Sequence, residues 1–231
     1  MILLLAPLAL ILFQAPAPMP AVLAYRFDEV KHSVLRWPGG DPRQEVKAAP
    51  GYPASAGDIV KTGWWGHAVI SVPARATRFE VYPSTQVRLA GGEPGVLIIL
   101  EQGRLKAIFD ALAGPPVERR VAVPGALLAV RGTRYGVAVD KAGKSTLVVF
   151  KGVVEVIPSA PHTTTVFVKA GEWSTFGPGL MPKVLPMPGH GFGEKGWEQG
   201  MHPGSMGMGT MTPGAIMPAG MPPGSMPGPM H

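Results

Sequence analysis

The sequence predicts an all-β protein, and three observations support this prediction. The stretch from Val121 to Pro158 is the densest run of β-branched and aromatic residues in the 231-residue chain. Within it, Tyr135, Val137 and Val139 alternate with small or polar residues, which is the period of two expected of a half-buried strand. Glycine, aspartate and proline interrupt the run at short intervals, as turns between consecutive strands do.

The same pattern recurs along residues 57–178, which are predicted to form one β domain of about ten short strands. The segments that carry it are 57–63, 66–72, 79–82, 86–89, 96–100, 104–109, 117–123, 135–139, 146–150, 153–157 and 163–168. Glu101-Gln102-Gly103 is expected to turn the chain between two of these strands. Many short strands at close spacing predict a two-layered solenoid-like or sandwich domain.

The first 24 residues have the features of a signal peptide. Ile2 to Phe13 is an apolar run too short to span a bilayer core. Val22-Leu23-Ala24 then places an aliphatic and a small residue where signal peptidase reads the chain, so cleavage is expected before Tyr25. This predicts an exported protein of the periplasm, the cell wall or the extracellular space, with no membrane span after the signal is removed. Residues 25–56, which hold several Pro-Gly clusters, are predicted to be irregular.

Residues 179–231 are predicted to form a disordered tail. No Asp, Glu, Lys or Arg follows Glu198, and Gly, Pro and Met dominate the rest, so the segment has no periodic apolar face. Thioether sulfur and imidazole are soft enough ligands to hold Cu(I). A metal site is therefore one hypothesis for Met201, His202, Met206, Met208, Met211 and His231. The alternative is a low-complexity linker whose methionines make flexible apolar contacts.

Composition and motifs argue against several functions. The chain has no cysteine, which excludes disulfides, thiolate metal sites and thiol catalysis. Its formal charge of +6 favours anionic partners, but the arginines are spread over many strands with no helix to carry them into a groove of nucleic acid. Ala142 to Thr146 imitates the end of a phosphate-binding loop but leads into a strand instead of a helix. We therefore expect no enzyme activity, no cofactor and no nucleic-acid partner.

Motifs between Gly57 and Trp173 resemble those of the FecR domain family in type and order. They are the opening GDIVKTG at 57–63, the turn LEQGRL at 100–105, the element VRGTRYGV at 130–137 and the closing KAGE at 169–172. The resemblance covers about half of the chain. FecR domains are extracytoplasmic modules named after the bacterial iron-dicitrate regulator. The resemblance implies an all-β module that serves protein or glycan contacts and has no catalytic residues.

The Arg-Gly-Thr turn within this region is the main candidate site. Gly132 permits a tight reversal between two strands, and the Thr133 hydroxyl can bond the backbone of the turn. Arg131 and Arg134 are expected to emerge near the bend, where Asp140 or Glu155 could pair with one of them. Two interpretations remain open, a fold-defining turn and a ligand or partner contact. The glycines predicted to define turns are Gly63, Gly103, Gly132, Gly143, Gly152 and Gly171.

Three functional hypotheses follow. The first is an exported, non-enzymatic FecR-like binding or sensing module of the cell envelope, whose partner is an envelope protein or an anionic glycan. The second is an envelope copper-handling protein that uses the Met- and His-containing tail. The third is a structural cell-wall protein that binds anionic glycan through its scattered arginines.

Overall fold

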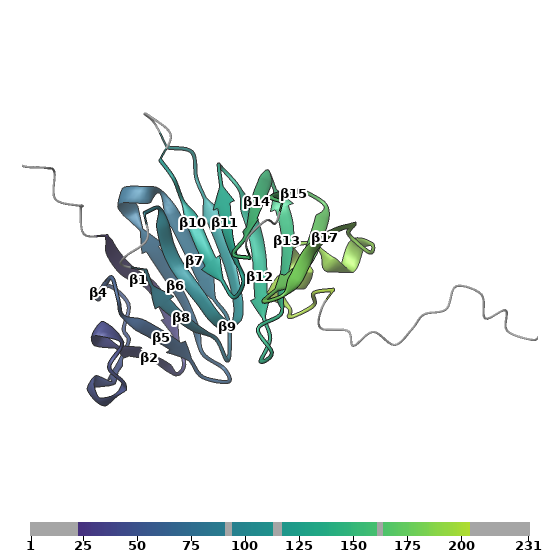
Figure 1. Cartoon of the computed structure of the whole chain (residues 1–231). Helices are drawn as coiled ribbons and strands as arrows, with labels where there is room; N and C mark the ends of the chain where they lie inside the picture. Colours follow the sequence, from purple (N-terminus) through teal and green to yellow (C-terminus); the bar gives the residue numbers. More distant parts are fainter. Residues whose placement is uncertain (1–22, 91–93, 113–116, 161–163, 204–231) are drawn as a thin grey trace, which may run out of the picture.

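The structure, a computed structural model, describes residues 23–90, 94–112, 117–160 and 164–203 (Figure 1). This part of the chain contains seventeen β-strands, several single-turn 3-10 helices and one short α-helix, α1 (Glu194–Glu198). The all-β prediction is confirmed. The strands outnumber those expected because segments on both sides of residues 57–178 also form strands.

The strands form one sheet whose two halves share β9 (Val96–Phe109), and every pairing except β9–β10 is antiparallel. The first half-sheet contains, in order, β4 (Pro53–Ser55), β1 (Ala24–Lys31), β6 (His67–Val72), β7 (Thr77–Val81), β9, β12 (Arg134–Val139), β13 (Ser145–Lys151), β16 (Glu172–Gly177) and β17 (Leu180–Pro186). The second half-sheet contains β3 (Val46–Lys47), β2 (Val34–Trp37), β5 (Ile59–Thr62), β8 (Gln86–Leu89), β9, β10 (Arg120–Val123), β11 (Ala126–Val130), β14 (Val153–Pro158) and β15 (Val166–Lys169).

The shared strand β9 passes from one half-sheet to the other at Gly103. Residues 96–102 of β9 pair with β8 and β10, and residues 103–109 pair with β7 and β12. Gly103 has a φ of 99°, and a Cβ added to it would lie 2.5 Å from the Thr85 Cα. The predicted turn at residues 101–103 is therefore wrong, because the positive φ bends the strand against Thr85 without reversing it.

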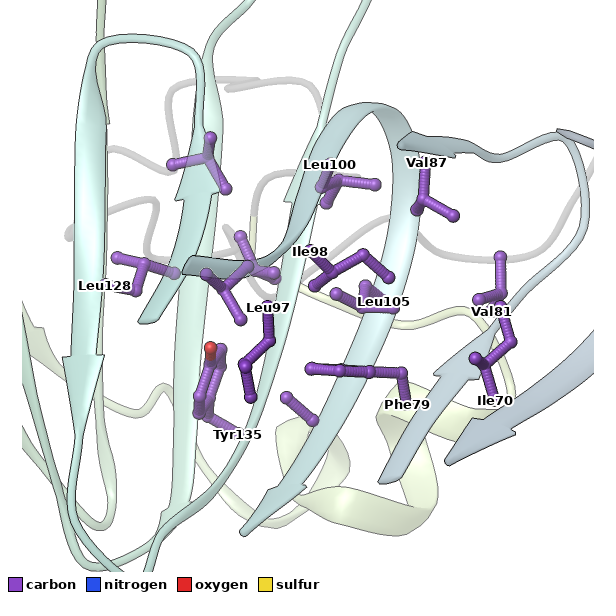
Figure 2. Packing of buried hydrophobic residues seen from close by; sticks show 14 of the residues in the cluster. Ile70, Phe79, Val81, Val87, Leu97, Ile98, Leu100, Leu105, Leu128 and Tyr135 are labelled. Atoms are coloured by element: carbon purple, nitrogen blue, oxygen red, sulfur yellow. The ribbon is translucent and has the colours of Figure 1, made fainter. Parts of the chain in front are cut away.

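One hydrophobic core joins the two half-sheets. Figure 2 shows Leu97, Ile98 and Leu100 from the first part of β9 in the same cluster as Leu105 from its second part. Residues 96–98 and 100 are almost fully buried. This explains why the segment reads as an unbroken apolar run, since both faces of the strand are covered there. Such burial is the main stabilising contribution to a β domain of this size.

The N-terminal segment from residue 25 is ordered, which corrects the expectation of an irregular segment. Strand β1 lies between β4 and β6, and Tyr25 and Phe27 on it are buried. The Tyr25 hydroxyl donates a hydrogen bond of 2.5 Å to the carbonyl oxygen of Leu97 on β9. The sequence does contain a signal for this strand, which is the alternation of Tyr25 and Phe27 with Arg26 and Asp28. Of the predicted signal peptide, residues 1–22 lie outside the described residues.

Residues 179–203, predicted to belong to a disordered tail, are also structured. Strand β17 pairs with β16 along most of its length, and α1 follows with Trp197 fully buried. The prediction failed here because pairing and burial of a single aromatic residue outweigh the unfavourable Gly and Pro content. The rest of that tail, residues 204–231, lies outside the described residues. Within the described ranges, we find no helix with the length and apolar character needed to cross a membrane.

The bend of β9 gives a stability prediction. Gly103→Ala should lower the free energy of unfolding by at least about 2 kcal/mol, because it combines a positive φ with a contact to backbone atoms that cannot move aside. Gly171→Ala is the matched control, since Gly171 has a φ of 83° but no neighbour within 4 Å of an added Cβ. Urea unfolding of both variants would measure the difference. Equal losses would contradict the close packing of Gly103 on Thr85.

Candidate functional site

The Arg-Gly-Thr turn connects β11 to β12, so it links the second half-sheet to the first. Gly132 has a φ of 63° and nothing within 4 Å of an added Cβ. The carbonyl oxygen of Thr133 accepts a hydrogen bond of 2.9 Å from the backbone N–H of Phe109 on β9. Thr133 is buried, and its hydroxyl has no hydrogen-bond partner among the described residues, so it does not make the expected bond to the turn.

The two arginines of the turn point to different surroundings. Arg134 Nη1 lies 3.2 Å from both carboxylate oxygens of Glu194, in the segment that was expected to be disordered. The expected partner Asp140 is occupied elsewhere, because it accepts hydrogen bonds from the backbone N–H groups of Ala142 and Lys144. Arg131 is exposed and makes no ion pair in the described part of the chain. The prediction of an Asp140 partner is therefore wrong.

Arg131 lines an open groove on the outward face of the second half-sheet. The groove has a volume of about 380 Å³. Its lining residues come from β10, β11, β14, β15 and the segments beside them, and they are Glu118, Arg119, Arg120, Ala129, Val130, Arg131, Val153, Glu155, Ile157 and Phe167. The expected partner Glu155 thus shares this groove with Arg131 without forming an ion pair.

The register of the strands explains the shape of the groove. Arg120 lies opposite Ala129, Ala129 opposite Glu155, and Glu155 opposite Phe167, so the four side chains form one row across β10, β11, β14 and β15. Neighbouring strands lie about 5 Å apart, and residues opposite each other point to the same face. Ala129 is the smallest of the four, so the row is hollow at its centre. The Phe167 side chain, 57% exposed, stands at one end of the row.

Two of the three arginines in the groove have hydrogen-bond or ion-pair partners. Arg119 donates to the backbone carbonyl oxygens of Arg75 and Asp110, and Arg120 pairs with Glu118 at 3.1 Å. Arg131 is then the groove arginine that makes no ion pair within the described residues, and it lines the same hollow as Glu155 and Phe167. A guanidinium next to an exposed aromatic ring can bind an anionic group that carries an apolar part. The charged residues that line the groove are three arginines and two glutamates.

The opposite side of the molecule carries a docked segment, which we call the C-terminal strap (residues 187–203). Trp197 from α1 packs on Gly136 of β12, where an added Cβ would lie 2.4 Å from the indole Cε2. Arg104 Nη1 donates a hydrogen bond of 2.7 Å to the Trp197 carbonyl oxygen. The Arg104 guanidinium also lies 4.8 Å from the centre of the Tyr82 ring and 5.8 Å from that of Trp197. The small residue at position 136 therefore makes room for the strap.

A buried lysine connects the strap to the first half-sheet. Lys106 Nζ lies 2.6 Å from Glu198, 2.9 Å from Glu194 and 3.4 Å from Glu80, with only 5% of its side chain exposed. Burial alone would lower the pKa of Lys106, but the hydrogen bonds with Glu198 and Glu194 and the charge of Glu80 raise it above its ordinary value. Burial would likewise raise the pKa of Glu194, but the hydrogen bonds and charges of Lys106 and Arg134 lower it.

The structure describes two of the six residues of the copper hypothesis. Met201 is partly exposed, and His202 packs on Trp197 with their ring centres 5.4 Å apart. Burial and the charge of Arg104 lower the pKa of His202 to about 4, so its imidazole is neutral at pH 7. In the described ranges, no three His, Asp or Glu side chains come close enough to hold a metal ion. Met206, Met208, Met211 and His231 lie outside those ranges, and the copper hypothesis stays a prediction.

The glycines predicted to define turns differ in conformation. Gly103, Gly132, Gly143, Gly152 and Gly171 have positive φ angles. Gly63 does not, and a Cβ added to it would lie 3.1 Å from the Cβ of Ser33. Whether each of them defines the fold stays a prediction.

No protein-family model matches the chain, and no match to a curated protein was found. Two crystal structures, at 1.65 and 2.50 Å resolution, of a "putative anti-sigma factor" from Parabacteroides distasonis ATCC 8503 are similar to it, each with 15% sequence identity and a TM-score of 0.46. Each similarity covers 56% of this chain and 59% of the other. The matched region therefore spans somewhat more than half the length of those structures.

Trp197 should hold the strap in place. Trp197→Ala removes a fully buried side chain, and such changes cost about 3 kcal/mol or more. The backbone amides of α1 should therefore lose about a hundredfold or more in hydrogen-exchange protection, while those of β9 keep theirs. Lys195→Ala is the control, because Lys195 is exposed on the same helix. Unchanged protection in Trp197→Ala would contradict the docking.

Acid should release the strap. Because the pKa of Glu194 is lowered by folding, the stabilisation it provides is present above the ordinary glutamate pKa of about 4.3 and is lost as the pH falls through the lower, folded value. The release would be followed by near-UV circular dichroism. Subtracting the spectrum of Trp197→Phe from that of the parent chain isolates the signal of Trp197 at each pH. Lys106→Gln should move the transition to higher pH, since Glu194 then loses its closest cation. The exposed Lys195→Gln should not move it, and a transition unaffected by Lys106→Gln would refute the assignment.

Proposed function

We propose that this protein is an exported, non-enzymatic, FecR-like binding or sensing module of the cell envelope. The groove around Arg131 is its contact surface, and its partner is an envelope protein or an anionic glycan. In this proposal, residues 57–178 correspond to the FecR-like domain, and the strap from residues 187–203 completes it on the other side.

The observation that carries the proposal is the state of Arg131. A guanidinium that has no ion-pair partner in the described part of the chain and lines the same hollow as a half-exposed phenylalanine is typical of a recognition surface. The other groove arginines already have partners, so an incoming anion gains most from Arg131. The position also agrees with the sequence, which places Arg131 in the element that resembles the FecR family most closely.

The arrangement of the chain supports the two-layered FecR-like module that the resemblance implies. From β10 onward the chain places two consecutive strands in one half-sheet and the next two in the other, so β10 and β11 are followed by β12 and β13 on the opposite side. β14 and β15 then return to the second half-sheet, and β16 and β17 to the first. Such alternation is expected of a solenoid-like or sandwich domain with a shared core.

A binding experiment with Arg131→Glu tests the proposal. The full chain beginning at Tyr25 would be immobilised and incubated with two separate fractions of the native envelope, purified cell-wall glycan and detergent-solubilised membrane proteins. We expect one fraction to bind, and Arg131→Glu to weaken that binding about tenfold or more, because it replaces attraction by repulsion at a desolvated contact. Lys151→Glu is the control, since Lys151 is exposed with the same change of charge but lies outside the groove.

The binding results distinguish a specific contact at the groove from a general effect of charge. Loss of binding in Arg131→Glu alone would support the groove as the contact surface and would identify the class of partner. Equal losses in both variants would indicate a general charge effect and would overturn the proposed site.

Retention of the chain in the cytoplasm when it is expressed with its own residues 1–24 would overturn the proposal of export.

A further inference from the structure

Two adjacent tryptophans form the tip of the turn between β5 and β6. The side chains of Trp64 and Trp65 are 76% and 74% exposed, the highest values among the large hydrophobic residues of the described part. A tryptophan offers 150–250 Å² of mostly apolar area, so leaving two of them side by side in water forfeits a large stabilisation. An exposed apolar patch of this kind marks an interaction surface.

The backbone of the turn is firmly held. Gly66 N–H donates to the Gly63 carbonyl oxygen at 2.9 Å, which closes the turn around the two tryptophans. The same carbonyl oxygen accepts a 3.0 Å hydrogen bond from Ser84 in the neighbouring β7–β8 turn, and Gly63 N–H donates to Ser33 in the β1–β2 turn. Three turns are thus joined at one end of the molecule. The backbone that carries the tryptophans is therefore fixed, so little backbone entropy is lost when they bind.

Thr62 strengthens this arrangement from inside. Its buried hydroxyl donates a 2.6 Å hydrogen bond to the Tyr82 carbonyl oxygen and accepts one of 2.9 Å from the Thr85 N–H. At Gly66, an added Cβ would lie 2.2 Å from the Ser33 carbonyl oxygen. The two glycines and Thr62 thus hold the turn through backbone contacts and one buried hydroxyl.

From this we infer that the Trp64–Trp65 turn inserts into the interfacial region of a lipid bilayer with anionic headgroups. Each side chain is about three-quarters exposed, so neither ring sits in a hollow that could select a shaped ligand. A protruding pair of rings fits a medium that has no fixed shape. Indole rings favour the membrane–water interface, where their apolar body and their N–H are both satisfied.

The positive charge of the chain favours anionic lipids. Lys31 and Lys61 are exposed near the joined turns; Lys31 pairs with Glu29, and the Lys61 ammonium lies 5.7 Å from the centre of the Trp37 ring. The whole chain carries a formal charge of +6, which favours an anionic surface. Cations close to an anionic bilayer each add attraction that falls off within a Debye length.

Glycan stacking is the main competing explanation, and the turn lacks what it requires. A specific sugar site places polar side chains beside the aromatic platform to bind the hydroxyl groups. Within this turn the residues that flank Trp64 and Trp65 are glycines, which offer backbone only, and the two turns joined to it contribute the small hydroxyls of Ser33 and Ser84. The inference does not depend on the groove at Arg131, which lies on other strands.

Vesicle sedimentation tests the inference. The chain beginning at Tyr25 would be mixed with extruded vesicles of phosphatidylcholine alone or of equal parts phosphatidylcholine and phosphatidylglycerol. We expect binding to the anionic vesicles, and the double variant Trp64→Ser/Trp65→Ser should reduce the partition coefficient by about tenfold or more. Tyr52→Ser is the matched control, because it removes a 63% exposed aromatic side chain that belongs neither to this turn nor to the groove, and it should bind vesicles as the parent does.

Each further outcome decides the question. Urea unfolding of the double variant should match the parent, since both side chains are exposed, and this separates a lost surface from a lost fold. Absence of vesicle binding by the parent, or unchanged binding by the double variant, would overturn the inference. So would tryptophan-dependent binding to purified cell-wall glycan without vesicle binding, or tryptophan-dependent self-association in sedimentation velocity. An Arg131→Glu variant that still binds vesicles would show that this surface and the groove act separately.

Discussion

The whole structure depends on β9 belonging to two half-sheets at once. A strand that crosses between them must bend while keeping hydrogen-bonded neighbours on both sides, and only glycine at position 103 accepts the required φ of 99° against Thr85. On one side of the bend the strand pairs with β8 and β10, and on the other with β7 and β12. The core closes around both parts, so the positions of all three candidate surfaces follow from this one strand.

These surfaces differ in chemistry because they lie on different parts of the same scaffold. Outward positions of β10, β11, β14 and β15 form the groove at Arg131, where a small alanine leaves a hollow between charged neighbours. The outer side of β12 and β13 is covered by the chain itself, through Trp197 and the carboxylates around Lys106. The joined turns at one end carry exposed indole rings. The proposed function assigns a polar partner to the groove, and the further inference assigns a bilayer to the joined turns, so the two contacts would use separate surfaces.

The sequence was informative wherever the pattern is local. Alternation of apolar residues located most strands between residues 57 and 178, and the turn at Gly132 was found from three neighbouring residues. Contacts between residues far apart in the chain could not be predicted from it. The partner of Arg134 is Glu194, sixty positions away along the chain, and nothing in the Gly-rich context of Trp197 indicates that it is buried on Gly136. The strand at residues 24–31 was missed because its alternation begins where the predicted leader ends. The continuation of β9 through Glu101–Gly103 was missed because glycine serves both for a reversal and for a bend.

The central claim is that β9 is one bent strand and not a hairpin, and backbone NMR tests it most directly. In the first case, amide and α-proton contacts from residues 96–102 reach β8 and β10, and those from residues 103–109 reach β7 and β12, with Gly103 opposite Val139. In the second case, residues 96–100 would show cross-strand contacts to residues 104–109. The account predicts the first set of contacts, and observation of the second set would contradict it.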